Sequence, residues 1–198
     1  MASIGLTGGI GSGKSAVARL LQDCGAWLVD TDAIAHELTL PGGAALPALR
    51  TAFGADIVSS DGSLDRARLR SVVFADPAAK RRLERLLHPV IAAVADERAA
   101  QAGGRTVVFD VPLLTESTRW RARVSRVLVV DCPEVLQVER VMRRSGWDAD
   151  AVQRVMAQQS SRAARRAIAD AVIFNGERTS LDDLARQARL LWRGWVDG

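Results

Sequence analysis

Short apolar runs alternate with longer amphipathic stretches along the chain. Five of these runs are rich in Val and Ile and have the composition of strands buried in a parallel sheet. Apolar residues at helical spacing fill the intervals between them. The alternation predicts a three-layer α/β/α fold around a parallel five-stranded sheet. The expected strands cover residues 3–7, 26–30, 106–110, 124–131 and 171–175.

Two helices of this fold are especially clear. One opens at Lys14 and places four apolar residues on one face: Val17, Leu20, Leu21 and Cys24. The last helix follows Ser180 and Asp183, which have the spacing of a capping box. Its apolar face is predicted to hold Leu181, Leu184, Ala188, Leu191, Trp192 and Trp195, with the two tryptophans in the core.

Two segments depart from the simple alternation of strand and helix. Residues 39–103 are mostly helical, and their stretch 78–100 predicts one long helix or two helices interrupted at His88-Pro89. Residues 139–169 are rich in arginine and helical, with a break expected at Ser145-Gly146. We expect both to be insertions at the carboxyl edge of a core formed by residues 1–38, 104–138 and 170–198.

Residues 8–15 match the phosphate-binding pattern G-x-x-x-x-G-K-[ST] at every fixed position. The pattern stands between an expected strand and an expected helix, where successive backbone amides can surround a phosphate. Lys14 would reach the terminal phosphates and Ser15 would hold Mg²⁺. The motif therefore predicts ATP and Mg²⁺ as cofactors. Its expected nucleotide-binding residues are Gly9, Gly11, Ser12, Gly13, Lys14, Ser15 and Ala16.

Lys14 is one of only two lysines among the 27 basic residues of the chain, and the other is Lys80. A phosphate loop requires a slim, flexible point charge at this position, for which the planar guanidinium of arginine is a poor substitute. The retention of lysine here, in a chain that otherwise uses arginine, favours a functional loop over a chance match.

Acidic residues follow two of the expected strands. Asp30 and Asp32 stand at the end of the second strand, where a carboxylate could accept the proton of an attacking hydroxyl or steer Mg²⁺ through its waters. Alternatively, Asp30 only ends the strand and Asp32 caps the next helix. Asp110 ends the third strand. It could steer a metal ion there, or it could only be the turn residue that follows the strand.

Arginines of the second insertion are candidates for neutralising the charge of a transferred phosphoryl group. Arg140 and Arg144 lie four apart and so share a helix face. Arg140 is the candidate we favour. The others, including Arg162, Arg165 and Arg166, have the alternative of a solvated helix surface.

Composition narrows the possible partners. The formal charge of +4 and the pI of about 10.0 are compatible with nucleic-acid binding. However, the arginines are dispersed, and with no Tyr and four Phe a base-stacking platform is not expected. We expect no membrane span, no signal peptide and no zinc-like Cys/His spacing, and therefore a cytoplasmic protein with reduced cysteines.

An ordered set of motifs along nearly the whole chain resembles the dephospho-CoA kinase family, whose members catalyse the last step of coenzyme A synthesis. The phosphate loop alone is shared by many kinases, whereas the complete set is specific to this family. The set consists of residues 6–15, Asp30-Thr31-Asp32-Ala33-Ile34-Ala35-His36, Leu87-His88-Pro89, Val111-Pro112-Leu113-Leu114 with Glu116, Arg140, Arg144, Gln159, Ala169-Asp170 and Asn175.

The resemblance implies a kinase that transfers the γ-phosphoryl group of ATP to the 3′-hydroxyl of dephospho-CoA ribose. It implies Asp32 as the general base, Lys14 at the β- and γ-phosphates and Arg140 acting from a lid of residues 139–169. Asn175 would lie beside adenine, and residues 39–103 would form a helical substrate domain. Further implied roles are substrate binding by Asp32, His36, His88, Pro112 and Leu113, and Mg²⁺ binding by Ser15 with Asp30 or Asp110 through water.

Two positions depart from the family pattern in ways that bear on ligands. Ala16 stands where Thr is usual, which removes one hydroxyl contact to phosphate but leaves the backbone donors in place. Thr115 replaces an aromatic or aliphatic residue before Glu116, which alters the packing expected at the substrate.

Other function classes account for fewer of these motifs. A small kinase of a nucleotide, nucleoside or other small alcohol shares the phosphate loop, but would not be expected to combine it with Asp-x-Asp, His-Pro and Pro-Leu-Leu. A dinucleotide-binding oxidoreductase requires Gly or Ala where Lys14 stands. A GTPase requires Asn-Lys-x-Asp, which the chain lacks. A simple ATPase would hydrolyse ATP without an acceptor.

Overall fold

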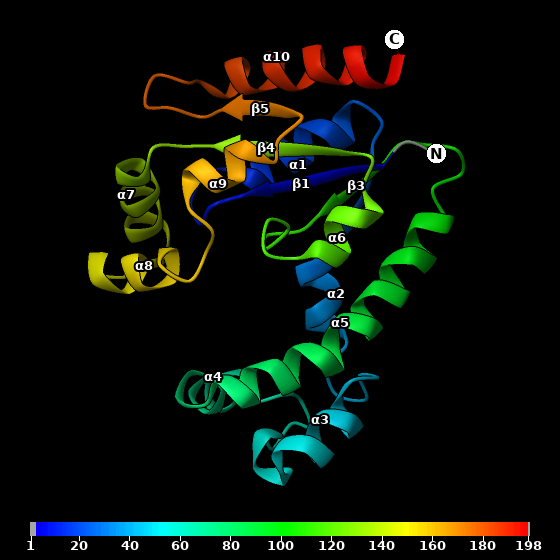
Figure 1. Cartoon of the computed structure of the whole chain (residues 1–198), viewed down its shortest axis with the longest axis vertical. Coiled ribbons are helices and arrows are strands. Elements are labelled where there is room, and N and C mark those ends of the chain that lie inside the picture. The colour runs from blue at the N-terminus through cyan, green and yellow to red at the C-terminus, as the bar shows by residue number, and fades with distance from the viewer. Residues whose placement is uncertain (1–2, 198) are drawn as a thin grey trace. The chain divides into compact units, whose positions relative to one another are not determined.

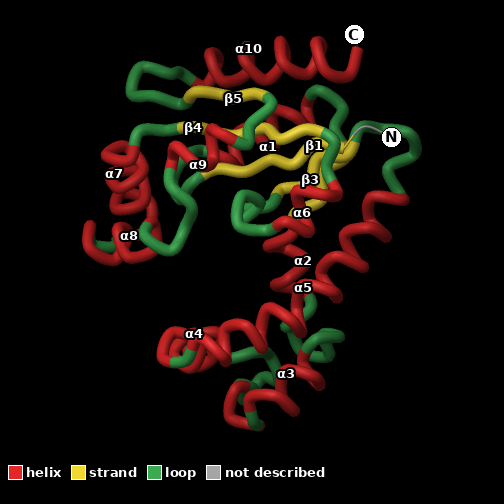
Figure 2. The backbone as a smooth tube through the Cα atoms, in the orientation of Figure 1, coloured by secondary structure: helices red, strands yellow, loops and turns green. Residues whose placement is uncertain are grey.

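The computed structural model describes residues 3–197 and divides into two compact units. One unit, Met1–Val29 with Ala102–Gly198, contains the sheet. The other unit, Asp30–Gln101, is built from helices and loops, as the tube in Figure 2 shows. The sequence-based boundaries, at residues 38/39 and 103/104, differ from this division mainly at the first one, because residues 30–38 belong to the helical unit. The assignment of substrate-domain and lid roles stays a prediction.

The sheet has the order β2-β3-β1-β4-β5. Its strands are β1 (Ser3–Gly8), β2 (Trp27–Asp30), β3 (Val107–Asp110), β4 (Arg126–Asp131) and β5 (Ala171–Phe174), each within two residues of the sequence prediction at either end. The α/β class with five parallel strands is therefore confirmed. Leu6 pairs with Asp110, Gly8 with Val130 and Asp131 with Phe174. This register brings the carboxyl ends of β3, β1, β4 and β5 to one edge.

Helices α1 (Lys14–Asp23) and α10 (Leu181–Trp192) pack against one face of the sheet (Figure 1). Their apolar stripes form the main core with the strands. Trp192 is buried in this core as predicted, whereas Trp195 is only partly buried and packs against it. The capping box of Ser180 and Asp183 is present. Leu181 is 65% exposed, because it precedes the turn at which the stripe meets the sheet. The core cluster contains Ile4, Leu6, Val17, Leu21, Val108, Leu128, Val130, Ile173, Leu184, Ala188 and Trp192.

The opposite face of the sheet is covered by α6 (Thr118–Arg123) and α9 (Arg162–Ala167). Phe109 of β3 packs on Trp120 of α6, with ring centroids 5.5 Å apart. Beyond the carboxyl ends of β4 and β5 lie α7 (Glu134–Ser145) and α8 (Ala149–Met156) (Figure 1). The break predicted at Ser145-Gly146 is confirmed, since α7 ends there with Gly146 at φ +68°. The chain ends in a π-helical turn, Arg193–Asp197.

The helical unit is organised around α5 (Pro77–Ala100), which packs against α2 (Thr31–Glu37), α3 (Leu46–Phe53) and α4 (Arg66–Ala75). A short 3₁₀ turn, Ala55–Ile57, joins α3 to α4. Of the two sequence alternatives for this region, a single long helix is observed, and Pro89 lies inside it. Among the described residues, no helix has the length and hydropathy needed to cross a bilayer.

The core contact of α1 gives a direct stability prediction. Leu21 is fully buried between α1 and the sheet, so Leu21→Ala should lower the free energy of unfolding by about 2–5 kcal/mol through lost burial and a residual cavity. Leu190→Ala is the matched control, because this leucine is 64% exposed on α10 and its truncation should cost about 0.5 kcal/mol or less. Urea denaturation of both variants measures the difference, and equal losses would contradict the assigned core.

Candidate active site

The loop between β1 and α1 has the backbone geometry of an anion cradle. Gly11 and Gly13 adopt φ of +73° and +93°, a region that favours glycine, and Gly13 is the N-cap of α1 without a side-chain cap. The amides of Gly13, Lys14 and Ser15 donate to no acceptor among residues 3–197. They form the positive end of the α1 dipole, where phosphate binds readily.

Side chains from two other segments hold this loop in place, and the main chain of α7 packs against it. Asn175 Nδ2, from the loop after β5, donates to the Ser12 carbonyl at 2.8 Å. Gln159, in the segment before α9, accepts from the Ile10 amide through Oε1 at 3.0 Å. A Cβ at Gly11 would lie 2.6 Å from the main-chain oxygen of Gln137 in α7. Glycine is therefore required by packing as well as by its backbone angle.

Lys14 forms an ion pair with Asp110 at the end of β3. Both side chains are largely buried, and the pairing of Leu6 with Asp110 across β1 and β3 explains why the two groups meet. The lysine of the glycine loop is therefore in direct contact with one of the acids that the sequence analysis proposed for steering a metal ion. Ser15 is exposed in the first turn of α1, and its hydroxyl accepts no hydrogen bond from the described residues. Ala16 lies in the same turn.

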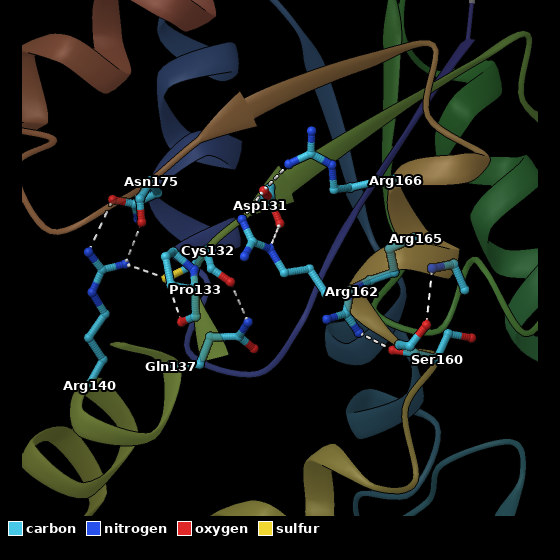
Figure 3. A network of polar contacts seen from close by, with 12 residues as sticks. Asp131, Cys132, Pro133, Gln137, Arg140, Ser160, Arg162, Arg165, Arg166 and Asn175 are labelled. Carbon is cyan, nitrogen blue, oxygen red and sulfur yellow. Dashed lines mark hydrogen bonds and ion pairs between the residues drawn. The ribbon is translucent and has the colours of Figure 1, made fainter. Parts of the chain in front are cut away.

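Arg140 of α7 contacts the loop that follows β5, as Figure 3 shows. Its guanidinium donates to Asn175 Oδ1 at 3.2 Å, to the Gly176 carbonyl at 3.2 Å and to the Asn175 carbonyl at 3.4 Å. It also lies 3.3 Å from Cys132 Sγ. Arg140 therefore connects α7 to Asn175, which itself holds the phosphate loop.

Asp131, at the carboxyl end of β4, is the centre of a second charged group that the sequence analysis missed (Figure 3). Its buried carboxylate accepts from Arg162 Nε at 2.6 Å and Nη2 at 2.8 Å, and from Arg166 Nη1 at 2.9 Å. The hydrogen bond from Arg162, followed by the charges of both arginines, lowers the pKa of Asp131. The sequence did contain a signal for Asp131, because this acid ends a core strand just as Asp30 and Asp110 do.

Arg165 is the other residue to which the sequence analysis gave too little weight. In the structure its guanidinium is buried beside Gly9 of the phosphate loop. Arg162 and Arg166 turn to Asp131 instead (Figure 3). Helical spacing does not separate the three arginines, because residues three and four apart share a helix face.

Asp30 and Asp32 have different local roles in the helical unit. Asp30 is the N-cap of α2 and accepts from the amides of Asp32 and Ala33, both at 2.9 Å. The alternative in which Asp32 caps this helix is therefore wrong, because Asp30 already occupies the cap and α2 starts at Thr31. Asp32 lies in the first turn of α2, where its charge interacts favourably with the helix dipole.

The remaining candidates lie in both units. His36, at the end of α2, accepts at Nδ1 from Arg66 Nη2 at 2.9 Å, which leaves its proton on Nε2, while His88 is exposed within α5. Pro112 offers its carbonyl to the Thr7 hydroxyl at 3.0 Å, and Leu113 beside it is 49% exposed. Thr115 has a buried hydroxyl without a hydrogen-bond partner among the described residues.

Comparisons with known proteins agree with this arrangement. The family model of dephospho-CoA kinase matches residues 2–180. This chain belongs to the dephospho-CoA kinase family. It is 53% identical to the dephospho-CoA kinase of Bordetella parapertussis over 99% of this chain and 92% of that protein. It is 54% identical to the dephospho-CoA kinase of Burkholderia lata over 99% of this chain and 96% of that protein.

Solved structures of other proteins have a similar fold. The crystal structure of TT1252 from Thermus thermophilus has 33% identity and a TM-score of 0.85 over 98% of this chain and 97% of that one. Dephospho-CoA kinase from Campylobacter jejuni, at 23% identity, has a TM-score of 0.64 over 99% and 98%. Shikimate kinase from Acinetobacter baumannii, at 16% sequence identity, has a TM-score of 0.55 and shares the fold. The resemblance drawn from the sequence motifs is confirmed.

The Asp131 group generates a prediction about acid stability. The folded-state pKa of Asp131 is below its unfolded value of about 3.9, so its stabilising effect is complete above that value and is lost as the pH falls through the folded pKa. Asp131→Asn should lower the free energy of unfolding by about 1–3 kcal/mol at neutral pH. Urea unfolding at decreasing pH should show this difference shrinking below about pH 4.

Asp56→Asn is the matched control for this measurement. Asp56 pairs with Arg68 on the surface, where both side chains are more than half exposed, so its replacement should cost about 0.5 kcal/mol or less. A loss for Asp131→Asn that is no larger than this, or that is independent of pH, would contradict the structural role of the Asp131 group.

Proposed function

We propose that this protein transfers the γ-phosphoryl group of ATP to the 3′-hydroxyl of dephospho-CoA ribose and so produces coenzyme A. The observation that carries the proposal is membership of the dephospho-CoA kinase family across residues 2–180, together with a glycine loop whose amides face an anion site at the start of α1. In-line transfer needs positioning and charge neutralisation, and the loop supplies both.

ATP would be held by the loop and by the segment after β5. The amides of Gly9 to Ala16 would surround the phosphates, and Lys14 would leave Asp110 to contact the β- and γ-phosphates. Asn175 would lie beside adenine. Arg140, which already contacts Asn175 and Gly176, would act from α7 on this nucleotide site.

The residues at the loop fit a magnesium ion bound mainly through phosphates and water. Ser15 offers one exposed hydroxyl and Asp110 one buried carboxylate, while no cluster of three or more His, Cys, Asp or Glu occurs among residues 3–197. Mg²⁺ typically keeps several waters and takes one or two protein ligands plus substrate phosphates. When bound, the ion would neutralise phosphate charge. Asp30 stays an alternative to Asp110 for steering it.

The residues proposed to bind the acceptor are those that the family resemblance implies. Asp32 is the proposed general base, which would accept the proton of the ribose 3′-hydroxyl. His36, His88, Pro112 and Leu113 are the proposed substrate contacts. Residues 39–103 would serve as the substrate domain, residues 139–169 would form the lid, and the protein would act in the cytoplasm.

A coupled assay of ADP release tests the proposed reaction. Release should require dephospho-CoA and should not be supported by nucleosides, shikimate or other small alcohols. The product should carry the new phosphate on the ribose 3′-oxygen, which phosphorus NMR identifies. Release with another alcohol in preference to dephospho-CoA would favour a different small kinase, and release without an acceptor would favour an ATPase.

Replacement of the proposed base gives a sharper prediction. Asp32→Asn should lower kcat by about 10²-fold or more, because general-base catalysis contributes roughly this factor, while the Kd for ATP should stay within about twofold. Steady-state kinetics and calorimetric titration with ATP measure the two quantities separately.

Asp182→Asn provides the matched control. Asp182 is the second residue of α10, as Asp32 is of α2, so the variant loses the same carboxylate at a helix N-terminus without touching the proposed site. Its kcat should equal that of the unmodified protein. Near-normal turnover of Asp32→Asn would refute the base assignment.

A further inference from the structure

Arg165 has an unusual environment for an arginine. The residue is 7% exposed, and Nη1 donates to the Ser160 carbonyl at 2.5 Å (Figure 3). Nη2 lies 2.8 Å from the point that a Cβ at Gly9 would occupy, so the guanidinium lies directly over the first turn of the phosphate loop. A side chain at position 9 would displace this guanidinium.

This guanidinium has no carboxylate within ion-pair distance among the described residues. Its neighbours on α9, Arg162 and Arg166, both pair with Asp131. Burial lowers the pKa of Arg165, while the charge of the more distant Glu116 partly opposes that effect. A buried charge without a counter-ion is costly, and the cost is removed when an anion binds beside it.

A second polar group faces the same place over Gly9. Gln137 Nε2 donates to the Cys132 carbonyl at 2.7 Å, which fixes the side-chain amide and leaves Oε1 toward the loop. Oε1 is buried and accepts from no donor among residues 3–197. It can orient the guanidinium by accepting one of its N–H groups while the others face the loop.

The other candidate arginine is already occupied. The guanidinium of Arg140 bonds to Asn175 and Gly176 and lies against Cys132, so its donors are directed at the segment after β5. Gly9 lies at the strand end of the loop, opposite the helix end where the amides of Gly13 and its neighbours would hold the α- and β-phosphates. A cation over Gly9 is therefore suited to the outermost phosphate.

We propose that Arg165 is a catalytic residue that contacts the terminal phosphate of ATP during its transfer. This inference rests on the proposed kinase function and adds a residue to it. The bond between Pγ and the bridging oxygen of ADP breaks, a bond from Pγ to the acceptor oxygen forms, and the acceptor proton passes to the general base. Arg165 neutralises charge on the equatorial oxygens of the moving group, as arginines do in other phosphoryl transfers.

Three variants test the proposal in the full-length protein. Arg165→Ala should lower kcat by about 10³-fold or more, with the Kd for ATP changed by less than about tenfold. Arg165→Lys should also be strongly impaired, because an ammonium lacks the planar fork of two parallel N–H donors with which a guanidinium binds phosphate. Arg166→Ala is the matched control from the adjacent position, since Arg162 still pairs with Asp131, and its kcat should stay within about twofold.

Guanidinium ion at tens of millimolar separates a catalytic role from a purely structural one. Arg165 lines a cavity of about 650 Å³ bounded by residues of α7 and α8, including Val138 and Met156, and this cavity gives a small cation access. Added guanidinium should restore kcat of Arg165→Ala at least tenfold and should leave Arg166→Ala unchanged. Thermal unfolding of each variant measures how much of any loss is due to unfolding.

A binding measurement without dephospho-CoA keeps this inference separate from the identity of the acceptor. ADP with aluminium fluoride mimics the transferred phosphoryl group and should bind the unmodified protein more tightly than ADP alone, by calorimetry. Arg165→Ala should lose this difference. The proposal is overturned if Arg165→Ala or Arg165→Lys keeps kcat within threefold, if guanidinium has no effect, or if the aluminium fluoride gain persists.

Discussion

The site depends on one backbone constraint: the amides at the start of α1 must stay open to an anion. Gly11 and Gly13 meet this constraint with positive φ angles, and Asn175, Gln159 and Gln137 hold the loop from outside. These holding groups come from the segment after β5, from the segment before α9 and from α7. The parallel sheet makes this possible, because the carboxyl ends of its strands deliver all of these segments to one edge.

Several charges at this edge are joined in ion pairs. Asp110 pairs with Lys14, and Asp131 pairs with two arginines of α9. Each of these acids is positioned by the end of a core strand, so the packing of the sheet fixes the charges as well as the loop. The guanidinium of Arg165 has no carboxylate within ion-pair distance among the described residues, and a triphosphate bound at the loop would supply negative charge beside it. The residues at these strand ends therefore contribute both to the stability of the fold and to the proposed ligand site.

Much of this molecule could be predicted from sequence, since its strongest signals are local. Short apolar runs located all five strands, and the glycine motif located the loop whose amides lie open at the start of α1. Arg165 and Asp131 needed the structure, because their partners lie far away along the chain. Pro89 shows the opposite limit, since a proline that can interrupt a helix lies inside α5. Likewise, sequence could not say which of two nearby acids caps α2.

Calorimetric titration of the protein with Mg-ATP, beside its Gly13→Ala variant, tests the central constraint most directly. Gly13 has φ of +93° and its added methyl group would collide with the Asn175 amide, whereas Gly25, at φ +103°, has open space around it. We expect binding by the unmodified protein and by Gly25→Ala, and a loss of at least about tenfold in Gly13→Ala. Unchanged affinity in Gly13→Ala, or no uptake of ATP by the unmodified protein, would contradict the account.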